Sequence, residues 1–94
     1  MKTIFLLMAQ YDGLAIIPLD RVCADYFHLT PEGMKRKVLT GEIDLVITRM
    51  EKSQKSALGV HVNDLAEYLD TQRDRAKVEH EKLMGRNVDK NRRR

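Results

Sequence analysis

The segment that decides the fold is residues 30–41, TPEGMKRKVLTG. Thr30 supplies a hydroxyl that can cap a helix, and Pro31 suits the first helical position. Met34 and Val38 lie one helical turn apart and predict a buried face, whereas the opposite side is polar and basic. The segment therefore predicts a short helix that packs through one face, presents cations on the other and ends at Gly41.

A second amphipathic segment lies directly before this helix. Its apolar residues recur at helical spacing and predict one buried stripe: Leu19, Val22, Cys23, Tyr26 and Phe27. His28-Leu29 then predicts a short turn between the two helices. Further upstream, residues 4–11 predict an apolar helix capped by Thr3, with a strand as the alternative, and residues 14–17 predict a buried strand.

Downstream of residue 41 the sequence predicts a β-hairpin followed by a long helix. Residues 45–50 and 60–62 are rich in β-branched side chains, which are typical of strands. The polar and basic residues 51–59 between them predict a flexible hairpin loop. Asn63 is a suitable N-cap for a helix over residues 64–84, whose apolar stripe becomes thin in its second half.

The order of helix, turn, basic helix, hairpin and long helix predicts an α+β fold. It is that of a winged helix-turn-helix, excisionase-like, with a long C-terminal helix. One such domain over residues 1–72 fits a chain of 94 residues. Residues 73–85 are expected to extend the last helix, into solvent or against another subunit, and residues 86–94 to form a disordered basic tail.

Positive charge is concentrated in two blocks of the chain, whose overall net charge is +3. Residues 34–58 carry six Lys or Arg against three Asp or Glu, and residues 86–94 carry five against one. The remaining segments are slightly acidic. This distribution predicts a localised anion-binding surface, with a solvated charged surface as the alternative.

DNA is the anion that this surface fits best, because phosphates and base edges offer mostly hydrogen-bond acceptors. Arg36 is the candidate for a base contact, since its planar guanidinium can pair with guanine O6 and N7. The hairpin loop is suited to phosphate or minor-groove contact, unless it is an ordinary polar loop. The predicted DNA-binding residues are Thr30, Lys35, Arg36, Lys37, Thr40, Arg49, Lys52, Ser53, Gln54, Lys55 and Ser56.

The sequence contains no pattern typical of a catalytic or metal site. His28, His61 and His80 are widely spaced, Cys23 lies on the predicted apolar stripe, and no phosphate-binding glycine loop or nucleophile elbow occurs. We therefore expect no enzymatic activity, no cofactor and no metal. The apolar run over residues 4–9 is too short for a signal peptide or a membrane span, so we expect a cytoplasmic protein without a membrane partner.

Eight short motifs follow one another along the chain. They are LLMAQY (6–11), IPL (17–19), VC with DYF (22–27), LTPE (29–32), RKV (36–38), GEI (41–43), SQKSA (53–57) and GVH with DLA (59–66). In this order they resemble the pyocin activator proteins, PrtN, over about residues 3 to 73 of this chain. The sequence departs from the family pattern at Val46 and Leu58, where the resemblance leads us to expect a proline and a lysine.

The resemblance implies a transcriptional activator of phage or pyocin-type bacteriocin genes under control of the DNA-damage response. Such an activator binds repeated promoter elements in double-stranded DNA and recruits transcription, so RNA polymerase and a homodimer or higher oligomer on DNA are expected. The chain is also similar to phage excisionases, which implies an architectural protein that bends DNA. A protein-binding module, such as a phage antirepressor, is the third alternative.

Overall fold

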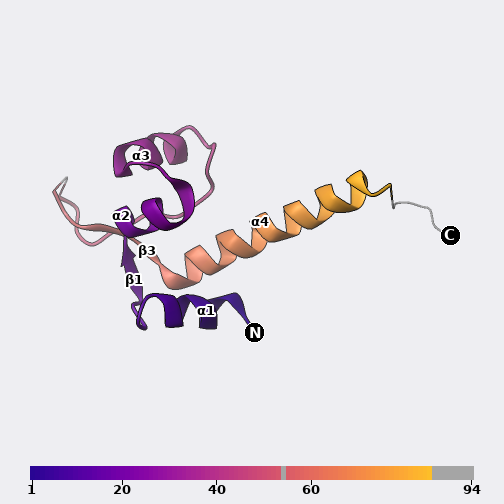
Figure 1. Ribbon diagram of the computed structural model, residues 1–94. Coiled ribbons are helices and arrows are strands. Elements are labelled where there is room, and N and C mark those ends of the chain that lie inside the picture. Colours follow the sequence, from indigo (N-terminus) through magenta and orange to yellow (C-terminus); the bar gives the residue numbers. More distant parts are fainter. Residues whose placement is uncertain (54, 86–94) are drawn as a thin grey trace.

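A computed structural model of the protein describes residues 1–53 and 55–85 (Figure 1). Its elements in chain order are α1 (Thr3–Gln10), β1 (Ile16–Pro18), α2 (Leu19–Val22), the π-helical turn η1 (Cys23–Phe27), α3 (Pro31–Leu39), β2 (Thr48–Arg49), β3 (Leu58–His61) and α4 (Val62–Leu83). The predicted α+β class is confirmed. The helix before the predicted turn consists of α2 continued by η1.

The three strands form an antiparallel sheet with β3 in the centre, between β1 and β2. Ile17 of β1 pairs with Val60, and Thr48 of β2 pairs with Gly59. The strand predicted over residues 45–50 is wrong in extent, because only two of these residues pair with β3. Leu45 is buried in the core, so the apolar pattern before β2 reflects side-chain burial without strand pairing.

Two local predictions near the sheet need correction. The first strand begins at Ile16 instead of residue 14 and includes Pro18, which an edge strand tolerates because its missing N–H has no pairing role there. Helix α1 has Lys2 at its N-cap, and the Thr3 hydroxyl instead donates to Asp70 Oδ1 of α4 at 2.5 Å. Both changes arise from contacts between segments that are far apart in the sequence.

The long helix starts two residues before its predicted first residue. His61, the last residue of β3, is its N-cap, and His61 Nδ1 accepts a hydrogen bond from the Asn63 backbone N–H at 3.0 Å. Asn63 is therefore not the cap. Because Val62 N–H donates to the Ala15 carbonyl at 2.8 Å, the chain passes directly from the sheet into α4.

The core lies where the sheet, α1, α2, η1, α3 and the first turns of α4 meet. Its buried residues are Leu7, Tyr11, Ile17, Leu19, Val22, Cys23, Met34, Leu45, Val60, Val62, Leu65 and Ala66. The stripe predicted before the turn is confirmed, since three of its members are buried and Tyr26 and Phe27 pack against them. In Figure 1, α1 lies on one side of the first half of α4 and α2 and α3 lie on the other.

The second half of α4 extends away from the rest of the fold (Figure 1). Every residue from Asp70 to Gly85 is exposed to solvent. The division predicted after residue 72 and the role of residues 73–85 in oligomerisation stay predictions. The predicted basic tail, residues 86–94, lies outside the described residues.

Tyr11 joins α1 to η1 from inside the core. Its side chain has no exposed surface, its hydroxyl donates to Asp25 Oδ2 at 2.6 Å, and the Arg21 guanidinium lies 4.8 Å from its ring centroid. Burial, followed by the hydrogen bond to Asp25, raises the pKa of Tyr11 well above its ordinary value. The protonated hydroxyl is therefore part of the folded structure.

We expect Tyr11→Phe to lower the free energy of unfolding by about 1.5 kcal/mol, the lower end of the range for a hydrogen bond to a charged group. The raised pKa means that this contribution is complete below the unfolded-state pKa of about 10 and declines as pH rises above it. Urea unfolding at neutral pH and above pH 10 should therefore show a difference between wild type and variant that shrinks in alkali. Tyr26→Phe is the control, because Tyr26 donates to Gln10 at an exposed site; an equal loss in both variants would contradict the argument from burial.

Candidate nucleic-acid interface

The turn before α3 is built around a left-handed residue. His28 has φ 56° and ψ 39°, and its backbone N–H donates to the Cys23 carbonyl at 2.7 Å. Thr30 then caps α3 as predicted, since its Oγ1 accepts from the Gly33 N–H at 3.1 Å, and Pro31 is the first helical residue. These local bonds fix the direction in which α3 leaves the turn, and they engage the hydroxyl of Thr30 within the protein.

Helix α3 has one buried side and one exposed side. Met34 is fully buried and Val38 packs against the core, as the sequence predicts. Lys35 and Arg36 are both exposed on the outer side. Among residues 1–53 and 55–85, the side chain of Arg36 has neither a hydrogen bond nor an ion pair, so its guanidinium is available to a ligand.

The end of α3 carries a small polar network around Glu42. Lys37 Nζ lies 3.4 Å from Glu42 Oε1, and the Thr40 hydroxyl donates to Glu42 Oε2 at 2.9 Å. The hydrogen bond from Thr40, followed by Lys37, holds the pKa of Glu42 below its ordinary value. Two of the predicted DNA-binding side chains are thus already engaged by a carboxylate, and phosphate would have to exchange with it.

Several of the predicted donors in the hairpin shape the loop itself. Arg49 Nη1 donates to the Ser53 carbonyl at 3.1 Å, Ser53 Oγ accepts from the Lys55 N–H at 3.1 Å, and Ser56 Oγ donates to the Glu51 carbonyl at 2.9 Å. By contrast, the ammonium groups of Lys52 and Lys55 have no partner in the part of the chain that the structure describes. Gln54, also predicted to bind DNA, lies outside that part.

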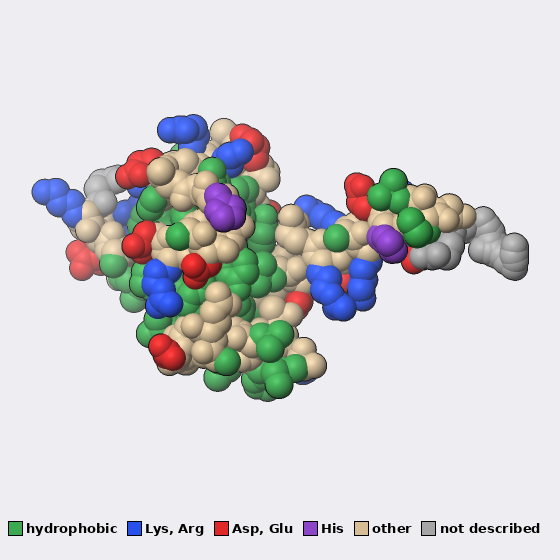
Figure 2. All heavy atoms as spheres, viewed as in Figure 1, with side chains coloured by type: hydrophobic (Ala, Val, Ile, Leu, Met, Phe, Trp, Pro, Cys, Tyr) green, Lys and Arg blue, Asp and Glu red, His purple; other side chains and the backbone are tan. Residues whose placement is uncertain are grey.

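A groove of about 230 Å³ joins α3 to the hairpin. Its lining residues are Lys35, Val38, Leu39, Ile47, Arg49 and Leu58. Lys35 from α3 and Arg49 from β2 therefore belong to one surface, although they are far apart in the sequence. Figure 2 shows Lys and Arg side chains over α3 at the top and at the hairpin on the left, with Asp and Glu side chains among them.

The apolar residues of this groove are absent from the sequence-based set. Leu39 follows Lys35 by four residues and Arg36 by three, so helical spacing alone places it on the exposed side of α3. The exposure of Leu39 could therefore have been predicted from the sequence. Ile47 and Leu58 had no comparable local signal, because they meet α3 only through the fold.

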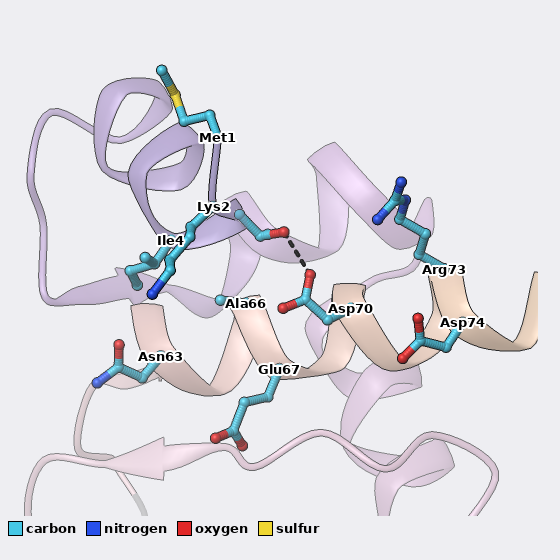
Figure 3. Close-up of a pocket in the computed structure, with 10 residues that line it drawn as sticks. Met1, Lys2, Ile4, Asn63, Ala66, Glu67, Asp70, Arg73 and Asp74 are labelled. Carbon is cyan, nitrogen blue, oxygen red and sulfur yellow. Dashed lines mark hydrogen bonds between the residues drawn. The ribbon is translucent and has the colours of Figure 1, made fainter.

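A larger hollow of about 610 Å³ lies between the start of α1 and α4 (Figure 3). Lys2 and Arg73 line it together with Glu67, Asp70 and Asp74. Because these cations stand among carboxylates, the hollow does not favour an anionic ligand. It also includes none of the predicted DNA-binding residues, and we do not assign it to the interface.

Within the described residues, no group of three or more His, Cys, Asp or Glu side chains is placed to hold a metal ion. None of the helices there combines the length and the apolar character needed to cross a membrane.

The sequence was also compared with known proteins. A sequence model of the family described as pyocin activator protein PrtN matches residues 3–76 of this chain. The comparisons with curated proteins and with solved structures found no match. The matched segment runs from α1 into α4 and includes α3, the hairpin and the groove between them. The chain belongs to the pyocin activator protein family.

Proposed function

We propose that this protein is a cytoplasmic, sequence-specific DNA-binding activator of transcription from pyocin or prophage genes. In this proposal α2 with η1 and α3 form a helix-turn-helix, α3 is the recognition helix, and β2 and β3 form the wing. Membership of the pyocin activator family supports the activation of pyocin genes. The observation that supports DNA binding is that Lys35 of α3 and Arg49 of the hairpin line the same groove.

The mechanism follows from the different exposure of the cations. Arg36, exposed and without a partner in the described residues, reads a base edge in the major groove. Lys35, Arg49, Lys52 and Lys55 neutralise phosphates, and the release of condensed counterions drives this part of binding. The protein then acts without catalysis, cofactor or metal, by bringing RNA polymerase to promoter repeats on which it binds as a homodimer or higher oligomer.

The proposal is tested by selecting duplexes from a random DNA library with the full chain. We expect enrichment of one sequence, tighter binding to it than to a scrambled duplex, and an affinity that falls as salt rises. A reporter gene placed behind the selected sequence should then respond to the protein. Absence of duplex binding at low ionic strength would refute DNA binding and favour the protein-binding alternative.

The excisionase-like alternative uses the same surface for a different purpose. It predicts bending of the selected duplex and support of recombination by an integrase, without activation of the reporter. Measuring the bend angle and the reporter response on the same duplex separates the two functions.

Lys55→Ala is expected to weaken binding to the selected and the scrambled duplex by the same factor. It should also reduce the slope of the logarithm of affinity against the logarithm of salt concentration by about one, because one phosphate contact is lost. Fluorescence anisotropy at several salt concentrations measures both quantities. Lys82→Ala, at the exposed end of α4, is the matched control and should change neither; a loss confined to the selected duplex would contradict a phosphate role for Lys55.

A further inference from the structure

Leu39 is an apolar side chain in the middle of a basic surface. It is 88% exposed, although it belongs to α3, whose opposite face packs into the core. It lies one helical turn from both Lys35 and Arg36. A single exposed apolar side chain is common on protein surfaces, but Leu39 shares a groove with the apolar residues Ile47 and Leu58. This apolar groove points to a contact with something outside the chain.

The surroundings of Leu39 restrict what that contact can be. Leu39 lines the groove together with Val38, Ile47 and Leu58, and Lys35 and Arg49 are the two charged residues that line it. An occupant must therefore offer an apolar group to the groove and negative charge close beside it. An uncharged apolar protein segment would leave both cations without a negatively charged partner.

Duplex DNA offers this combination at one place. The thymine C5-methyl group is the apolar group that base pairs present in the major groove, and phosphates border the groove on either side. We propose that Leu39, with the groove beside it, receives a thymine methyl group and so specifies thymine in the target sequence. The inference rests on the proposed function and adds a base preference to it.

The helix geometry also predicts where this thymine lies. Leu39 follows Arg36 by three residues, which places their side chains about 5–6 Å apart on one side of α3. Base pairs are stacked about 3.4 Å apart. The thymine is therefore one or two base pairs from the base that Arg36 contacts.

The test uses the duplex obtained from the random library, with each thymine in turn replaced by deoxyuridine. This change removes the C5-methyl group and leaves base pairing intact. We expect the wild type to lose about four-fold in affinity when thymine is replaced at one or two positions, the value of one buried methyl group. Leu39→Ala should bind the thymine duplex and the corresponding deoxyuridine duplex equally. Leu6→Ala is the control, because Leu6 is a 55% exposed leucine on α1, and it should keep the wild-type preference for thymine.

The outcomes separate this inference from the proposed function. If no duplex is bound selectively, both are wrong. If a duplex is bound selectively but tolerates uracil everywhere, or if Leu39→Ala keeps the penalty for uracil, the thymine contact is wrong and DNA binding stands. Thermal unfolding of Leu39→Ala is expected to match the wild type, so loss of folding would not account for its loss of preference.

Discussion

Replacing Gly59 by alanine is expected to lower the free energy of unfolding by about 3 kcal/mol. Gly59 is buried in β3, where an added Cβ would lie 2.5 Å from Ile16 Cγ2 and 2.8 Å from the Ile17 carbonyl oxygen. The first neighbour is on a β-branched side chain with little rotational freedom, and the second is backbone. The extra methyl group can be accommodated only if β1 and β3 move apart.

Urea unfolding followed by circular dichroism measures this effect, with Gly41→Ala as the control. Gly41 has φ 81°, and no atom lies within 4 Å of the position that a Cβ would take there. Alanine at this position therefore meets only the left-handed backbone penalty of about 1 kcal/mol. Gly59→Ala should be clearly the less stable of the two. Equal stabilities would show that β1 and β3 adjust at little cost, contrary to the expectation.

A second variant keeps the test informative if Gly59→Ala does not fold. Ile16→Ala combined with Gly59→Ala removes the contact at 2.5 Å and leaves the contact with the Ile17 carbonyl. The double variant should therefore recover part of the stability that Gly59→Ala loses. Because β3 also pairs with β2, which carries Arg49, separation of β1 from β3 should weaken DNA binding as well.

The helices on either side of the turn were predictable because their signals are local. The apolar spacing of Leu19, Val22 and Cys23 marks the side that is buried, and Thr30 followed by Pro31 marks the start of α3. Each of these signals lies within a few residues of the feature that it predicts. No contact with a distant segment is needed to interpret them.

The strands and the cap of α4 depend on distant partners, so the bounds of the strand over residues 45–50 and the cap of α4 were predicted wrongly. Residues 45–50 have the composition of a strand, yet only Thr48 and Arg49 lie opposite residues of β3. His61 caps α4 because its pairing with Ile16 ends the sheet at that residue. A preference for asparagine at helix starts carries no information about this pairing.

The candidate site was predictable in its charges and in the exposure of Leu39, but not in the rest of its apolar part. The sequence identifies Lys35 and Arg49 as candidates, but their common groove exists only because the hairpin folds beside α3. The same folding brings Ile47 and Leu58 to the groove. The bonds that engage Ser56 within the loop likewise depend on a loop conformation that composition does not specify.

The largest effect on binding is expected from Arg36→Ala, which should weaken binding to the selected duplex by about 1–3 kcal/mol. The guanidinium can donate two parallel hydrogen bonds to guanine O6 and N7, and alanine leaves these acceptors without that partner. Binding to a scrambled duplex should change little, because there Arg36 has no matching base. Fluorescence anisotropy with both duplexes at one salt concentration measures the difference.

Two further comparisons assign this loss to base reading instead of charge. Arg36→Lys keeps the charge but not the planar fork, so it should retain binding to the scrambled duplex and still lose selectivity. Arg73→Ala removes the same charge from an exposed position on α4 and should leave selectivity unchanged.

Replacing the contacted guanine by 7-deazaguanine completes the argument, because it removes the N7 acceptor from the DNA side. Wild type should lose affinity for this duplex, whereas Arg36→Ala should bind it as it binds the guanine duplex, since that variant already lacks the bond to N7. Additive losses would mean that Arg36 and the guanine act independently. In that case the base contact belongs to another residue of α3, and the exposed guanidinium of Arg36 serves only to attract phosphate.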